Sequence, residues 1–90
     1  MQRFLIERSF PETLQLSTDD EGAQVCEMLI ANNALEQVTW IHSYVTTDRK
    51  KTFCIYDAPS PEAIRAAAST SKMPVDRITQ VRVLNPYFHR

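Results

Sequence analysis

The feature that most constrains the fold is a pair of alternating stretches, residues 39–45 and 51–56, joined by the short polar segment 46–50. A period of two places successive side chains on opposite faces of a strand, so the pair predicts a β-hairpin. One face is mostly apolar and is the predicted core face: Ile41, Ser43, Val45, Phe53 and Ile55. The opposite face combines apolar bodies with polar tips: Trp40, His42, Tyr44, Thr52, Cys54 and Tyr56. We expect this second face to carry function.

The register of the hairpin follows from the same sorting, because a slip of one residue would mix the two faces. A turn centred on Asp48 gives three cross-strand pairs: His42 with Cys54, Trp40 with Tyr56, and Ile41 with Ile55. The sequence therefore predicts an imidazole opposite a thiol on the face with polar tips.

Two further strands are predicted from alternation. In the first, over residues 3–8, one set of side chains alternates with another: Phe4, Ile6 and Arg8 against Leu5 and Glu7. Phe4 and Ile6 are expected to join the core, which places Leu5 and Glu7 on the opposite face. The last strand is predicted over residues 78–84.

Two helices are predicted from their capping signals. Thr18 can cap the first helix, with Glu21 three residues further on, and Asn32–Asn33 is its expected end. Ser60 is placed to cap the second helix, and Pro61 suits its first position.

The resulting order is strand, helix, strand, strand, helix, strand, which is the pattern of the ferredoxin-like fold. Right-handed crossovers then give a four-stranded antiparallel sheet in the order 4-1-3-2, with both helices on one face. We predict an α+β protein with a single domain over residues 1–90. The other sheet face would expose Leu5 and the aromatic side chains, so a homodimer of the dimeric α+β barrel type is expected to cover it.

A metal site is predicted on that face, because the first, third and second strands are neighbours in this order. Glu7, Cys54 and His42 could then lie across three adjacent strands that are about 5 Å apart. Carboxylate, thiolate and imidazole together suit Ni, Zn, Cu or Fe better than Mg or Ca. Three aromatic side chains are expected to frame the site or bind a ligand: Trp40, Tyr44 and Tyr56. The protein would then sequester or sense a transition metal.

Two alternatives stay open. The same face could form the pocket of a dimeric α+β barrel enzyme or small-molecule binder, with His42 as general acid or base. It could also be consumed entirely by dimerisation in a purely structural protein. Nucleophilic catalysis by Cys54 with His42 is disfavoured, because no third group is placed to orient the pair. We assign no catalytic residue and leave enzyme activity open.

Composition excludes several classes of function. A net charge of −1 gives no electrostatic reason to expect a nucleic acid or a membrane surface as partner. No apolar segment approaches the roughly 20 residues that span a bilayer, and the N-terminus lacks a signal-peptide centre, so we expect a cytoplasmic protein. The single glycine, Gly22, excludes glycine-rich phosphate loops.

Several segments carry a resemblance to a known family: residues 3–11, 40–45, 51–65, 74–78 and 85–88. They resemble a small bacterial family that was first catalogued as a domain of unknown function and then described through a nickel-binding actinobacterial member. The resemblance implies a ferredoxin-like fold, a dimer and nickel, Ni(II), as the metal. It implies no enzyme activity. His42, Cys54 and Glu7 all fall inside the segments that carry it.

Overall fold

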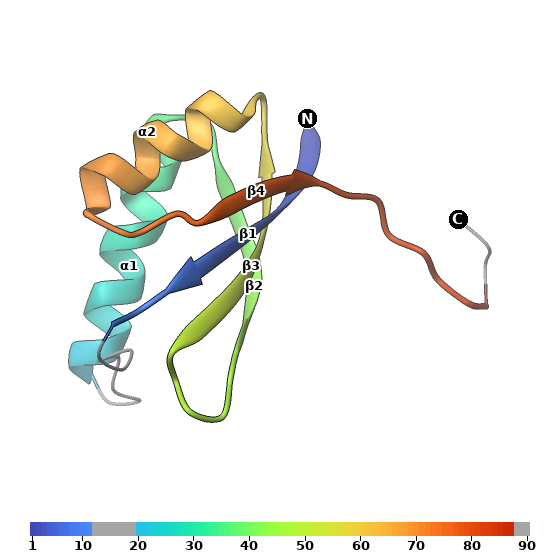
Figure 1. The fold of residues 1–90 in the computed structure, drawn as a ribbon. Helices are drawn as coiled ribbons and strands as arrows, with labels where there is room; N and C mark the ends of the chain where they lie inside the picture. The colour runs from blue at the N-terminus through green and yellow to red at the C-terminus, as the bar shows by residue number, and fades with distance from the viewer. Residues whose placement is uncertain (12–19, 88–90) are drawn as a thin grey trace.

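The computed structural model describes residues 1–11 and 20–87 (Figure 1). Its helices and strands follow the predicted order: β1 Gln2–Ser9, α1 Asp20–Leu35, β2 Thr39–Val45, β3 Lys51–Ala58, α2 Pro61–Ser71 and β4 Arg77–Gln80. In that part of the chain, no helix is long and apolar enough to cross a membrane.

The four strands form one antiparallel sheet in the order β2-β3-β1-β4, which is the predicted order counted from the other edge. Both helices lie on one side of the sheet (Figure 1). We call this side the helix face and the opposite side the open face. The prediction of an α+β protein with a ferredoxin-like arrangement is confirmed.

Strand β4 is shorter than predicted. It pairs with β1 only from Arg77 to Gln80, and one further backbone bond joins Val81 N to Arg3 O at 3.0 Å. The pairing ends before β1 does, since Gln2 and Arg3 of β1 lie beyond the last pair, Phe4 with Gln80.

On the central strand β1, the predicted faces are correct, since Phe4 and Ile6 are buried beneath the helices. On β3 the prediction is wrong. The buried set on β3 is Thr52, Cys54, Tyr56 and Ala58. Phe53 and Ile55 are only half-buried and belong to the open face. Pairing with β1 explains which face of β3 is buried. Residues opposite each other share a face, and Cys54 lies opposite the buried Ile6.

Strand β2 contains a bulge at Ile41, which has no partner between the pairs Trp40–Tyr56 and His42–Ile55. An extra residue on one strand changes which face the following side chains occupy. The predicted Trp40–Tyr56 pair is confirmed, whereas the predicted His42–Cys54 and Ile41–Ile55 pairs are wrong. Cys54 lies opposite Ser43 instead.

Helix α2 matches its predicted signals. It begins at Pro61, and the Ser60 side chain accepts a hydrogen bond from Ala63 N at 3.2 Å. Its buried face consists of Ile64, Ala67 and Ala68, and small side chains there let the helix lie close to the sheet.

Helix α1 is covered less completely. It runs to Leu35, two residues beyond the predicted end, and Gln37 then takes the left-handed conformation with φ 61°. The predicted cap, Thr18, lies outside the described residues. Only Gly22 and Asn33 are buried on this helix. Several of its apolar side chains are exposed: Val25, Met28, Ile30 and Leu35.

The Ser60 cap gives a first testable prediction. Ser60→Ala leaves Ala63 N without its side-chain acceptor and is expected to lower the free energy of unfolding by about 1 kcal/mol. For a domain of this size, that lowers the melting temperature by roughly 4–8 °C. Thermal unfolding followed by circular dichroism measures the shift. Ser69→Ala, at an exposed position of α2, is the matched control, and an equal loss there would contradict the capping role.

Candidate functional site

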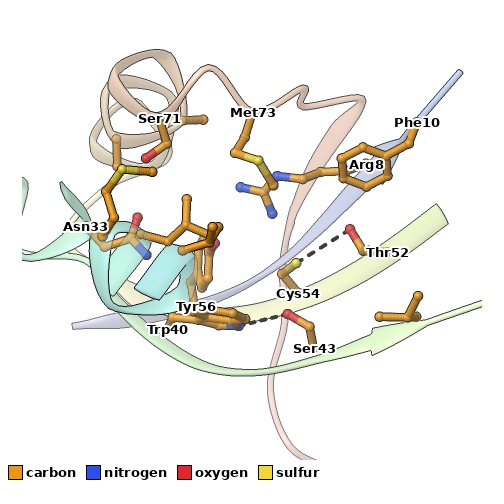
Figure 2. Close-up of a pocket in the computed structure, with 16 residues that line it drawn as sticks. Arg8, Phe10, Asn33, Trp40, Ser43, Thr52, Cys54, Tyr56, Ser71 and Met73 are labelled. Carbon is orange, nitrogen blue, oxygen red and sulfur yellow. Dashed lines mark hydrogen bonds between the residues drawn. The ribbon is translucent and has the colours of Figure 1, made fainter. Parts of the chain in front are cut away.

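The structure distributes the predicted site residues over both faces of the sheet. Cys54 and Tyr56 lie on the helix face, where each is 6% exposed. Trp40 also faces the helices, because it packs against the buried core. Its Nε1 donates a hydrogen bond to Ser43 Oγ at 2.8 Å (Figure 2). His42 and Tyr44 lie on the open face. The sheet therefore separates the His42 imidazole from the Cys54 thiol.

Glu7 lies on the open face with His42, but on a different strand. It pairs with Phe53 of β3, whereas His42 pairs with Ile55 of the same strand. Two strand spacings, about 10 Å in all, therefore separate the β1 and β2 backbones. Within the described residues, no group of three or more His, Cys, Asp or Glu side chains could hold a metal ion. The ligands that these described residues supply within one copy do not by themselves fit a complete nickel site.

The open face is nevertheless chemically distinctive. The His42 and Tyr44 rings meet edge to face, with centroids 5.2 Å apart and planes at 89°. Tyr44 is 63% exposed, and the neighbouring Leu5, Phe53 and Ile55 are half-buried. The face thus offers an exposed imidazole next to an apolar and aromatic surface.

One ion pair lies at the end of this face. Arg3 Nε and Nη2 donate to Asp57 Oδ1 and Oδ2 at 2.8 and 3.2 Å, a two-pronged geometry that matches a guanidinium to a carboxylate. The hydrogen bond from Arg3 lowers the pKa of Asp57 below its usual range.

On the helix face, a cavity of about 160 Å³ lies between the sheet and the two helices (Figure 2). All elements but β4 contribute to its walls. Three of the predicted ligand-binding or metal-binding residues line it: Trp40, Cys54 and Tyr56. His42 and Tyr44 do not line it, because they lie on the opposite side of the sheet. The predicted site residues are therefore divided between the two faces.

Arg8 is the most unusual side chain of this cavity. It is 2% exposed, and its Nε and Nη1 have no hydrogen-bond partner in the described part of the chain. Its guanidinium carbon lies 5.5 Å from the centroid of the Tyr56 ring, a cation–π contact. Figure 2 shows the side chain reaching from β1 toward the middle of the cavity. The sequence contained a signal for it, because Arg8 alternates in phase with Phe4 and Ile6.

The other polar groups of the cavity are uncharged. Burial raises the pKa of the Tyr56 phenol, and the smaller opposing effects of Arg8 and Asn33 do not reverse the shift. Tyr56 therefore remains neutral at pH 7. Asn33 Nδ2 is buried without a partner among the described residues, and Cys54 Sγ donates to Thr52 Oγ1 at 3.7 Å.

The chain is similar to known proteins in its family profile and in its fold. No curated protein matches the chain. Among solved structures, the crystal structure of SCO4226 from Streptomyces coelicolor A3(2) matches with a TM-score of 0.71 and 18% sequence identity, covering 90% of this chain and 96% of that chain. At this identity, the likeness supports the fold. The profile of the family described as "Nickel responsive protein SCO4226-like" matches residues 4–81. Because that match spans most of the sequence, the chain belongs to the SCO4226-like family of nickel responsive proteins.

Proposed function

We propose that this protein binds nickel in order to sequester or sense it, and that the ion is held between two copies of the chain. Membership of a family described as nickel responsive is the observation that carries the proposal. The exposed His42 imidazole on the open face supplies a ligand of the type that nickel accepts in proteins.

A second copy is part of the proposal because the residues described in one copy bring too few ligands together. A twofold axis through the interface of two open faces would bring together two copies of each ligand. It would also let Glu7 of one copy approach His42 of the other, whereas within one chain two strand spacings separate their backbones. Leu5, Phe53 and Ile55 provide apolar surface for such a contact. Cys54 is not included, because it lies under the helices.

Isothermal titration with Ni²⁺ tests the proposal, using protein purified without a histidine tag. Wild type is expected to release or absorb measurable heat, and His42→Ala is expected to lose most of it because an imidazole ligand is removed. Sedimentation velocity, run with and without Ni²⁺, should show the metal increasing the fraction of dimer.

Cys54→Ser is the matched control, since it changes a metal-ligand type on the helix face. It should leave the Ni²⁺ titration unchanged. Negligible heat for wild type, or equal heats for wild type and His42→Ala, would refute the role of His42. A loss of binding in folded Cys54→Ser alone would instead place the metal on the helix face.

A further inference from the structure

We propose that the cavity under the helices binds a small apolar monocarboxylate, whose carboxylate pairs with Arg8. This site is independent of nickel binding and lies on the opposite side of the sheet from His42. Arg8 of β1, Asn33 of α1 and Tyr56 of β3 are among the polar side chains that line it. Its walls are mostly apolar side chains from the two helices and β2.

The first argument is the missing counter-charge. A guanidinium stays protonated in proteins, and burying it without a partner is strongly unfavourable. No acidic side chain among the described residues forms an ion pair with Arg8. The adjacent Glu7 lies on the other face, and Asp76 accepts a hydrogen bond from Ser9 Oγ. Arg3, on the same strand, does have a counter-charge, because its guanidinium binds the Asp57 carboxylate through two nitrogens.

The second argument is the kind of polar atom left unpaired. The buried side-chain atoms without a partner in the described residues are Arg8 Nε, Arg8 Nη1 and Asn33 Nδ2. All three are donors. Buried donors in native proteins are almost always satisfied by an acceptor. Tyr56 cannot supply a negative charge, because burial keeps its phenol protonated. The acceptors that line the cavity, such as the Tyr56 phenol oxygen that interacts with Arg8 and Asn33, are neutral. A carboxylate adds two acceptor oxygens together with the missing charge.

The third argument is size and polarity. The cavity of about 160 Å³ is close to the engineered apolar cavity of about 150 Å³ that holds benzene. Trp40, Leu29 and Ala68 are among its apolar walls. A single guanidinium matches a single negative charge, so a monocarboxylate with a small apolar body fits better than a dianionic phosphate.

The cavity also has an opening. Val25 and Met28 of α1 both line it, and they are 41% and 52% exposed. A side chain that contacts both the cavity and solvent marks the rim. A ligand could thus enter along α1 with its carboxylate leading toward Arg8.

Titration calorimetry with benzoate tests the site, with the neutral isostere benzamide as matched probe. EDTA in the buffer excludes any contribution from a bound metal. Benzoate is expected to bind wild type at least about 10-fold more tightly than benzamide, because charge-assisted hydrogen bonds exceed neutral ones in strength. Inorganic phosphate is expected to bind more weakly than benzoate.

Variants then locate the binding. Arg8→Met should lose the preference for benzoate, and Arg8→Lys should retain part of it because the charge remains. Arg3→Met is the control, since it removes a β1 arginine from the open face and should bind benzoate as wild type does. Equal affinity for benzoate and benzamide, tighter binding of phosphate, absence of benzoate binding to wild type, or unchanged preference in Arg8→Met would each overturn the proposal.

Discussion

Replacing Arg8 by methionine is expected to stabilise the ligand-free protein, by about 1–4 kcal/mol in the free energy of unfolding. The wild-type protein buries the positive charge of Arg8 in a largely apolar cavity, and two of its nitrogens have no hydrogen-bond partner among residues 1–11 and 20–87. Methionine is unbranched and apolar, and it can fill the same channel without that desolvation penalty. The cation–π contact with Tyr56 is lost, but such contacts contribute only about 0.5–2 kcal/mol.

Urea unfolding of wild type, Arg8→Met and Arg3→Met measures this effect. Arg3→Met removes an ion pair whose side chains are about one third exposed, so its effect on the free energy of unfolding should be small. Saturating benzoate should then stabilise wild type by mass action and leave Arg8→Met unchanged. A loss of several kcal/mol in ligand-free Arg8→Met would show that Arg8 is a structural element of the fold, which contradicts the interpretation of an uncompensated charge.

The order of the elements could be predicted from the sequence because its signals are local. The Ser60 cap, Pro61 at the first position of α2 and the alternation around Ile6 each depend on a few neighbouring residues. Six elements in this order leave few topologies once right-handed crossovers are required. The sheet order and the placement of both helices on one face were therefore accessible without the structure.

The buried face of β3 could not be assigned in the same way, because both faces of this strand carry apolar side chains. Phe53 and Ile55 are as apolar as Cys54 and Tyr56, so the alternation alone favours the wrong set. The deciding interactions are non-local. Pairing with β1 puts Cys54 beside Ile6, and small residues such as Ala58 allow α2 to approach.

The bulge at Ile41 had no local signal either. The residue is neither glycine nor polar, and the sequence around it alternates without interruption. The bulge nevertheless changes the site, because it leaves Trp40 facing the helices while His42 and Tyr44 face away. Arg8 is a different case. Its phase with Phe4 and Ile6 was visible, and a charge on a core face is a signal that deserves weight in sequence analysis.

The assignment of faces predicts that two chemically identical substitutions on neighbouring strands have very different effects. Ile6→Ala removes a fully buried side chain on the helix face and is expected to lower the free energy of unfolding by about 2–5 kcal/mol. Ile55→Ala acts on a half-buried side chain of the open face and should lower it by about 1 kcal/mol in the monomer. Urea unfolding at a protein concentration where sedimentation shows only monomer measures both.

The same pair of variants distinguishes a structural role from a role in association. If two copies pack through their open faces, raising the protein concentration should increase the stability of wild type and Ile6→Ala, because dimerisation stabilises the folded chain by mass action. Ile55→Ala should show a smaller increase, since it removes part of the interface. Equal losses for the two variants in the monomer would contradict the assignment of faces. Identical concentration dependence in all three proteins would not contradict the assignment of faces, but it would exclude Ile55 from the dimer contact. The proposed nickel site would then require another partner surface.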